Sequence, residues 1–228
     1  MSTLQPERNI SFLNSARLTA SDFFNIGRAI VQRDPMGRYY RQLRTFPEGF
    51  VMPEQAARLR QIANSRHIFT IAEIGFNGGH SAYNFLLTSP FVRVVSFESS
   101  IGSHVMLAKK RIDSLFPQRH KLITGDSKEK VPLAAADGLR AGLIFIDGDH
   151  SLEGARADLE NCRGLADQDT IVVMDDIDPV YPWGVGPSEA WREAERAGKL
   201  ETTSQHFLRE HRSMAVGRYL GLPTPAEI

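Results

Sequence analysis

Apolar and polar positions follow two alternating patterns along this chain, and the alternation is regular from residue 68 onward. Short apolar, β-branched runs predict strands that are buried on both faces, as in a parallel sheet. Between them, apolar residues recur three or four positions apart, which predicts amphipathic helices. Strands are predicted over residues 68–74, 92–97, 121–124, 141–146 and 170–174, and helices over residues 81–87, 103–116, 152–163 and 187–197.

The pattern changes near the C-terminus. Thr203–Arg209 and Met214–Leu220 are strand-like and are joined by the polar segment Glu210–Ser213. A connection this short allows only antiparallel pairing. We therefore predict an α/β fold: a Rossmann-like, seven-stranded, mostly parallel sheet with a C-terminal antiparallel strand pair.

Residues 1–67 have a different pattern from the rest of the chain. They contain helix-like pieces over Ser21–Gln32 and Pro53–Asn64, and Pro35-Met-Gly37 has the composition of a turn. We predict that residues 1–67 form an N-terminal helical cap over a ligand cleft. Residues 68–222 are predicted to form the ligand-binding domain.

The first predicted strand leads into the most informative segment, Glu73-Ile-Gly-Phe-Asn-Gly-Gly-His-Ser81. Strand, glycine-rich turn and helix bring bare backbone up to a nucleotide-like ligand in open α/β sheets. Gly75 and Gly79 remove side chains where such a ligand lies close. A dinucleotide fingerprint has glycine at the third turn position, where this chain has Asn77. The segment instead resembles motif I of class I S-adenosylmethionine-dependent methyltransferases.

Composition and charge exclude several classes of function. Lys+Arg and Asp+Glu are both 27, so the formal net charge is zero and gives no support for nucleic-acid or anionic-membrane binding. The single cysteine, Cys162, excludes an internal disulfide and is expected to be buried. Residues 1–8 lack a secretory signal, and no apolar run approaches the roughly 20 residues that cross a membrane. We expect a cytoplasmic protein with a small-molecule partner, no nucleic acid and no membrane.

Ligands of an open parallel sheet bind beyond the carboxyl ends of its strands. The second predicted strand ends at Glu98, followed by Ser99, where an acid can accept hydrogen bonds from two ribose hydroxyls. A solvated strand end is the alternative for Glu98. The third strand leads into Asp126 and Ser127, which suit an adenine edge or an ordinary turn.

Acidic residues follow the fourth and fifth strands. The fourth ends in Phe145-Ile-Asp-Gly-Asp-His150 and the fifth in Met174-Asp-Asp-Ile-Asp178. Neighbouring strands lie about 5 Å apart, so Asp147, Asp175 and Asp176 are expected to converge. Carboxylates without a partner raise one another's pKa, and a divalent cation between them relieves this; oxygen ligands favour Mg²⁺, Mn²⁺ or Ca²⁺ over zinc. The alternative is that these acids cap helices.

Together these motifs resemble the metal-dependent O-methyltransferases of the catechol and caffeoyl-coenzyme A type and their bacterial relatives in secondary metabolism. The resemblance extends from Val51-Met-Pro-Glu-Gln55 to Asp176. It implies S-adenosylmethionine as the cofactor, and a divalent cation held by Asp147, Asp175 and Asp176. Mg²⁺ is the ion that we expect there. The implied cofactor-binding residues are Met52, Glu73, Gly75, Asn77, Gly79, Ser81, Glu98, Ser99, Asp126, Ser127 and Asp147.

His150 departs from the family pattern, which has a general-base lysine at this position. An imidazole can deprotonate a hydroxyl or bind a metal, and the alternative is an ordinary residue at a helix N-terminus. We predict methyl transfer to a hydroxyl oxygen of a small hydroxylated metabolite, with His150 and Asp147 as the catalytic residues. Tyr181, Pro182 and Trp183 are candidates for a substrate lid or for an ordinary packed loop.

Three other functions stay open on the sequence. A metal-independent methyltransferase would use His150 alone. A Rossmann-type oxidoreductase would share Gly75 and Glu98, but it conflicts with Asn77 and with the terminal strand pair. A non-catalytic binding protein would be expected to lose the acids at the cleft. The resemblance is also compatible with a homodimer.

Overall fold

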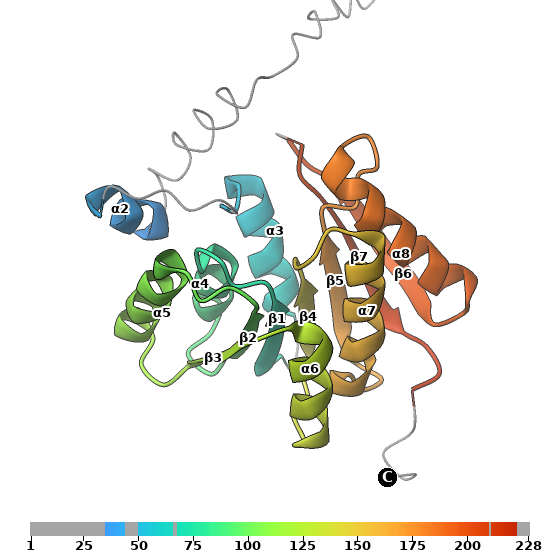
Figure 1. The fold of residues 1–228 in the computed structure, drawn as a ribbon, viewed down its shortest axis with the longest axis horizontal. Coiled ribbons are helices and arrows are strands. Elements are labelled where there is room, and N and C mark those ends of the chain that lie inside the picture. Colours follow the sequence, from blue (N-terminus) through green and yellow to red (C-terminus); the bar gives the residue numbers. More distant parts are fainter. Residues whose placement is uncertain (1–34, 44–49, 66–67, 210, 223–228) are drawn as a thin grey trace, which may run out of the picture.

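A computed structural model describes residues 35–43, 50–65, 68–209 and 211–222. Figure 1 shows a central sheet with helices on both of its faces. The strands are β1 Thr70–Ile74, β2 Arg93–Glu98, β3 His120–Thr124, β4 Leu143–Ile146, β5 Ile171–Asp175, β6 Leu200–Phe207 and β7 Ser213–Tyr219. Their order in the sheet is β3-β2-β1-β4-β5-β7-β6.

The pairing directions confirm the predicted fold class. Strands β3, β2, β1, β4 and β5 pair in parallel, whereas β7 pairs antiparallel with both β5 and β6. The carboxyl ends of the five parallel strands therefore meet at one edge of the sheet, where the sequence places its glycine turn and acids.

Helices cover both faces because side chains alternate across each strand. The helices are α2 Pro35–Gln42, α3 Pro53–Ala63, α4 His80–Leu86, α5 Ser103–Leu115, α6 Ser127–Ala136, α7 Leu152–Cys162 and α8 Val185–Arg196. From the central strands, Ile71 and Phe145 pack in one core with α2, α3, α4 and α5, while Ala72 and Ile144 pack in the other with α6, α7 and α8. Short 3₁₀ helices lie at Arg163–Leu165 and Pro182–Gly184.

One sequence-based expectation about local structure was wrong, and one helix was not predicted. Pro35-Met-Gly37 does not form a turn but begins helix α2. Proline is tolerated in the first turn of a helix, and the burial of Met36 and Tyr40 stabilises that helix against the core. Helix α6 was not predicted, because it contains Pro132 and has little apolar periodicity.

The described part of the N-terminal segment packs on the domain. Helix α3 confirms the helix expected at Pro53–Asn64, whereas the helix expected at Ser21–Gln32 lies outside the described residues. The Tyr40 hydroxyl of α2 donates a hydrogen bond of 2.9 Å to the backbone oxygen of Gly78 in the glycine turn. Among the described helices, none is long and apolar enough to span a membrane.

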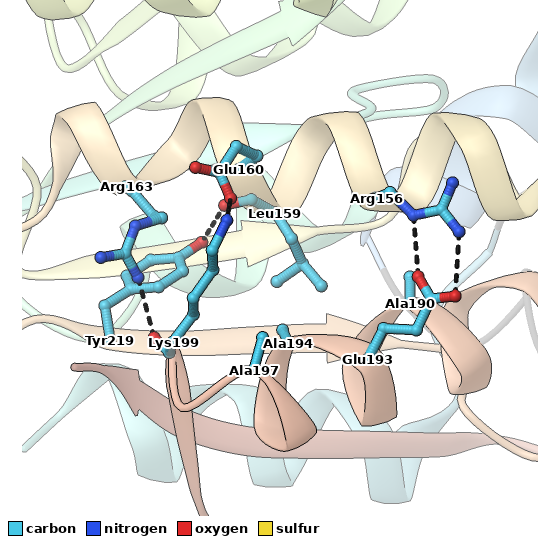
Figure 2. Close-up of a pocket in the computed structure, with 10 residues that line it drawn as sticks. All are labelled: Arg156, Leu159, Glu160, Arg163, Ala190, Glu193, Ala194, Ala197, Lys199 and Tyr219. Atoms are coloured by element: carbon cyan, nitrogen blue, oxygen red, sulfur yellow. Dashed lines mark hydrogen bonds and ion pairs between the residues drawn. The ribbon is translucent and has the colours of Figure 1, made fainter. Parts of the chain in front are cut away.

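Helices α7 and α8 lie side by side away from the glycine turn and border a small open pocket of about 160 Å³ (Figure 2). Its ends carry the ion pairs Arg156–Glu193 and Lys199–Glu160. The Tyr219 hydroxyl donates to the backbone oxygen of Leu159 at 2.8 Å. These contacts hold α8 and the C-terminal strands against the parallel part of the sheet.

Gly75 lies at the closest approach between the glycine turn and the end of β4. Its φ is +88°, and a Cβ built there would lie 2.0 Å from the backbone oxygen of Asp147. Its N–H donates to the backbone oxygen of Phe97 at 2.9 Å, so β2 and β4 hold the turn from both sides. Only glycine fits this position.

Replacing Gly75 by alanine should therefore destabilise the fold more than replacing a glycine with the same dihedral angle in open space. Gly138 is that control, since its φ is also +88° and a Cβ there meets nothing within 4 Å. We expect Gly138→Ala to cost about 1–2 kcal/mol for the left-handed backbone, and Gly75→Ala to cost roughly 1–3 kcal/mol more for the clash. Urea unfolding of both variants measures the difference, and equal losses would contradict the close approach.

Candidate active site

A cleft with a volume of about 580 Å³ opens beyond the carboxyl ends of β1 to β4. The structure brings a subset of the sequence-predicted cofactor residues together in its lining: Gly75, Asn77, Glu98, Ser99, Asp126, Ser127 and Asp147. The lining also includes residues that the sequence did not single out, among them Ser100, His104, Lys128 and Asp158. Met52, Glu73, Gly79 and Ser81 lie outside it.

Glu98 fixes the glycine turn at the end of β2. Its carboxylate accepts backbone hydrogen bonds from Phe76 at 3.0 Å, Asn77 at 2.8 Å and Ser100 at 2.7 Å. Asn77 has a φ of 42°, a left-handed conformation that asparagine tolerates better than most residues. A carboxylate can accept about four hydrogen bonds, so Glu98 keeps capacity for a ligand hydroxyl.

Glu73 supports the same turn from inside the protein. Its side chain is fully buried and accepts hydrogen bonds from the hydroxyls of Ser81 and Ser96. Burial is the main cause that raises the pKa of Glu73 to about 8, although both hydroxyls act against it. The Ser96 hydroxyl also lies 2.9 Å from His120 Nε2, which extends this buried network to β3.

Met52 and Gly79 have structural positions at helix starts. Met52 is the N-cap of α3, and its backbone N–H donates to Gln55 Oε1 at 3.2 Å. Gly79 is the N-cap of α4 with a φ of 69°. Both residues therefore position elements at the cleft without lining it.

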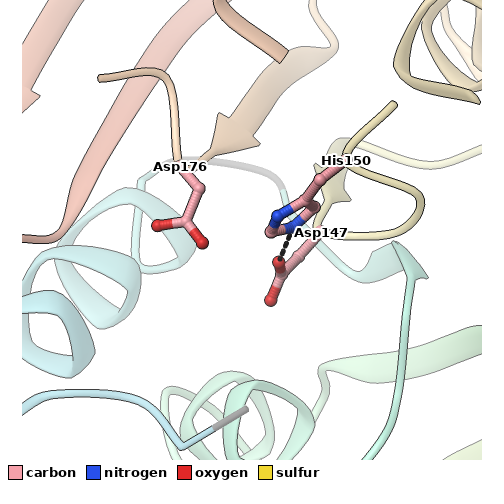
Figure 3. Close-up of side chains that lie close together, drawn as sticks. All are labelled: Asp147, His150 and Asp176. Carbon is pink, nitrogen blue, oxygen red and sulfur yellow. Dashed lines mark hydrogen bonds and ion pairs between the residues drawn. The ribbon is translucent and has the colours of Figure 1, made fainter. Parts of the chain in front are cut away.

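Asp147, His150 and Asp176 form a cluster beside the cleft (Figure 3). One ligand atom from each lies within 4.8 Å of the others, a spacing that can hold a metal ion. His150 Nε2 lies 3.4 Å from Asp147 Oδ1. Asp147 and His150 follow β4 and Asp176 follows β5, so the pairing of these two strands creates the cluster.

Asp175, the remaining expected metal ligand, has another partner. Its Oδ2 accepts a hydrogen bond of 2.5 Å from Gln55 Nε2 of helix α3. Burial, together with the charges of Asp176 and Asp147, raises the pKa of Asp175 well above its usual value. The structure thus groups His150, in place of Asp175, with Asp147 and Asp176.

The charges of the cluster are partly compensated by the chain itself. Arg212 Nη1 lies 3.5 Å from Asp176 Oδ2, and the hydrogen bond with Asp147 is the main cause that raises the pKa of His150. Burial raises the pKa of Asp176 to about 6, and Asp147 adds to the shift, while Arg212 and His150 oppose it. Asp176 Oδ1 is buried and has no hydrogen-bond partner within the described part of the chain.

Arg212 and Gln55 were not identified as site residues from the sequence. Arg212 lies in the short connection between β6 and β7, which the sequence presents only as a polar turn. Gln55 belongs to the Met-Pro-Glu-Gln stretch, whose spacing gives no sign that its amide binds Asp175. Their roles depend on packing between distant segments.

The aromatic loop after β5 lies against the β6–β7 connection. Tyr181 and Trp183 stack with ring centroids 5.0 Å apart, and the Tyr181 hydroxyl forms a hydrogen bond with His211 Nδ1. His211 directly precedes Arg212, so the loop and the charged partner of Asp176 are linked. The substrate lid expected at residues 181–183 stays a prediction.

Comparisons with known proteins agree with this geometry. Residues 72–177 match a family model described as a methyltransferase domain. Among curated protein sequences, no match to the chain is found. The solved structure of cofactor-bound Rv0187 from MTB is 21% identical with a TM-score of 0.69, and the alignment covers 86% of this chain and 95% of that one.

Two further solved structures are similar over nearly their whole length. The O-methyltransferase from Bacillus cereus in complex with SAH (S-adenosylhomocysteine) is 18% identical, with a TM-score of 0.69 and coverage of 88% and 97%. The O-methyltransferase TomG from Streptomyces achromogenes, involved in tomaymycin synthesis and solved with SAM (S-adenosylmethionine), is 20% identical, with a TM-score of 0.66 and coverage of 92% and 100%. Residues 72–177 therefore match a methyltransferase domain, and the chain has the fold of these methyltransferases, as its motifs predicted.

The buried Glu73 should make the stability of the protein depend on pH. The folded protein keeps Glu73 protonated up to about pH 8, whereas the unfolded chain releases this proton above about pH 4.5. The contribution of the neutral side chain is therefore fully present below pH 4.5 and is lost as the pH rises through 8. Between pH 5 and pH 9, the parent should lose about 4 kcal/mol relative to Glu73→Gln.

Urea unfolding of the parent and Glu73→Gln across this pH range tests the expectation. Glu129→Gln is the control, because Glu129 is an exposed acid on α6. A stability difference between the parent and Glu73→Gln that does not change with pH would show that Glu73 is ionised in the folded protein.

Proposed function

We propose that this chain transfers a methyl group from S-adenosylmethionine to a hydroxyl oxygen of a small metabolite, assisted by a divalent cation. One observation carries the proposal: Asp147 lines the cleft and also belongs to the cluster with His150 and Asp176. A methyl donor bound along the cleft would thus end beside groups that can activate a hydroxyl. The methyltransferase domain and the O-methyltransferases of the same fold support this choice.

The order of strands supports one orientation of the donor. Glu98 at the end of β2 is suited to the ribose, and the cluster lies at the ends of β4 and β5 on the other side of β1. If the sulfonium methyl is to reach the cluster, the adenine must point the opposite way, toward Asp126 and Ser127 after β3. The donor then lies across the glycine turn.

His150 and Asp147 are the proposed proton acceptor and its partner. Asp147 orients the imidazole and favours its protonated form, so His150 can take the hydroxyl proton of the acceptor. An acceptor oxygen lone pair then attacks the methyl carbon in line with the breaking carbon–sulfur bond, and the products are the methyl ether and S-adenosylhomocysteine. Holding both substrates in line supplies much of the rate enhancement.

The donor set fits a divalent cation. Asp147 and Asp176 offer carboxylate oxygens, and Asp176 Oδ1 is a buried acceptor with no partner among the described residues. Asp175 could become a cation ligand only if it gave up its hydrogen bond with Gln55, whereas His150 already lies in the cluster. A bound cation would supply Lewis-acid stabilisation of the developing oxygen anion. Carboxylate ligands suit Mg²⁺ or Mn²⁺.

A metal-independent methyltransferase is the second candidate, and one observation favours it. Arg212 pairs with Asp176 and His150 with Asp147, so the chain itself provides positive charge for the two carboxylates. A Rossmann-type oxidoreductase lacks comparable support, given the methyltransferase domain. The homodimer, the cytoplasmic location and a place in secondary metabolism stay proposals that rest on the resemblance alone.

Calorimetric titration with S-adenosylhomocysteine tests the donor site. We expect the parent to bind it and Glu98→Gln to bind at least about tenfold more weakly, since that variant has fewer acceptor oxygens for backbone and ribose donors. Glu129→Gln, outside the cleft, should bind like the parent. Absence of binding to the parent would overturn the proposed function as a whole.

Titration with Mn²⁺ or Mg²⁺ tests the cation separately. We expect cation affinity to fall at least about tenfold in Asp176→Asn, because a ligand oxygen and its charge are lost. Asp178→Asn is the matched control, since Asp178 follows the same strand but lies outside the cluster. If S-adenosylhomocysteine binds and neither cation does, the metal-independent candidate replaces the first, and methyl transfer should then survive a chelator but not His150→Ala.

A further inference from the structure

Asp158 is a buried carboxylate in the lining of the cleft that the proposed reaction does not use. It belongs to helix α7, behind the cleft, and only 1% of its surface is exposed. Its Oδ1 accepts a hydrogen bond of 2.6 Å from the Ser127 hydroxyl, at the first residue of helix α6. Its Oδ2 has no hydrogen-bond partner in the described part of the chain.

Asp158 is closely packed on the side that faces Gly148. A Cβ on Gly148 would lie 2.8 Å from Asp158 Oδ2, so a side chain at that position would collide with the carboxylate. Burying a carboxylate with one oxygen unsatisfied costs free energy. Packing of α7 on the sheet is already provided by Ala155, Leu159 and Cys162. A buried acid at this place therefore calls for a role beyond packing.

The hydrogen bond from Ser127 to Asp158 determines what the hydroxyl can do toward the cleft. A serine hydroxyl has one proton and two lone pairs. With its proton held by Asp158, the Ser127 hydroxyl can only accept hydrogen bonds from a ligand in the cleft. It therefore favours a ligand N–H at this place and disfavours a carbonyl oxygen.

The other acid near the expected adenine site has a different task. Asp126 is the N-cap of α6, and its Oδ1 accepts a hydrogen bond of 2.9 Å from the backbone N–H of Lys128. Asp126 is also exposed, whereas the Ser127–Asp158 pair is held inside the wall of the cleft. The pair is thus the better placed to distinguish one base from another.

We propose that Asp158 is a specificity-determining residue for the methyl donor: it holds the Ser127 hydroxyl as an acceptor that selects the exocyclic amino group of adenine over an oxo group. This inference rests on the proposed function, which orients the adenine toward Ser127. Asp158 acts through Ser127 and does not itself contact the ligand, because its free oxygen is buried.

Calorimetry with two ligands tests the inference: S-adenosylhomocysteine and its hypoxanthine analogue, in which an oxo group replaces the amino group. The parent should bind the adenine compound at least about tenfold more tightly. In Asp158→Ala this ratio should fall toward one, mainly because a freed Ser127 hydroxyl can donate to the oxo group. Ser127→Ala should also lower the ratio, but by weaker binding of the adenine compound, and Asp126→Ala should leave it unchanged.

Each other outcome has a definite meaning. Equal weakening of both ligands in Asp158→Ala would show that the residue is only structural, and a lower ratio in Asp126→Ala alone would assign the selection to Asp126; either result overturns the inference. If the parent binds neither ligand, the proposed function fails instead.

The parent itself offers a second test, should Asp158→Ala fail to fold. Burial raises the pKa of Asp158 to about 6, with Asp149 and Asp126 adding to the shift and the Ser127 hydrogen bond and Lys128 opposing it. Burial also raises the pKa of Cys162, one turn along α7, and of Tyr219, so these two stay neutral.

A protonated Asp158 can donate a hydrogen bond to Ser127, which frees the Ser127 hydroxyl to donate to an oxo group. The preference of the parent for the adenine compound over the hypoxanthine analogue should therefore fall as the pH is lowered from 8 to 5. The ratio of Ser127→Ala should stay constant, and a constant ratio in the parent would overturn the inference.

Discussion

The close approach of Gly75 to the backbone oxygen of Asp147 is the contact on which the rest of the site depends. It leaves no room for a Cβ and joins the glycine turn after β1 directly to the end of β4. The same turn is tied to β2 by the three backbone hydrogen bonds that Glu98 accepts. Because of these contacts, the cleft and the acid–imidazole cluster are parts of one rigid edge of the sheet. A donor lying on the turn would therefore lie beside an acceptor held at Asp147.

The acids at this edge do not stand as isolated charges. Asp147 has His150 as a partner, Asp176 has Arg212, and Asp175 has the Gln55 amide. These partners lower the repulsion that three neighbouring carboxylates would otherwise exert. They also explain how the folded protein can hold the acids close together before any cation binds. A cation in the proposed site would bind where the Arg212 guanidinium already compensates part of the negative charge. The affinity for the cation would therefore reflect competition with that guanidinium.

The sequence predicted the parts of the structure that depend on local pattern and on sheet topology. The strand runs, the glycine turn and the acids after β4 and β5 follow from periodicity and from the rule that parallel strands end at one edge. Which side each acid faces could not be predicted. Asp175 and Asp176 are adjacent in the sequence, yet Asp176, which has a left-handed backbone with a φ of 53°, joins Asp147, whereas Asp175 binds Gln55 of α3. Arg212 and Asp158 likewise reach the site through packing between segments far apart in the chain.

Acids that hold a neighbouring polar group recur around this site. Glu73 holds the hydroxyls of Ser81 and Ser96, Asp147 orients the imidazole of His150, and Asp158 holds the hydroxyl of Ser127. For Asp158, the carboxylate accepts the proton of the Ser127 hydroxyl, which leaves the lone pairs of that hydroxyl for a ligand. A hydroxyl or imidazole in water is free to donate or accept, and that freedom would weaken discrimination between ligands. The buried Asp158 thus sets the hydrogen-bonding direction of the Ser127 hydroxyl before any ligand binds.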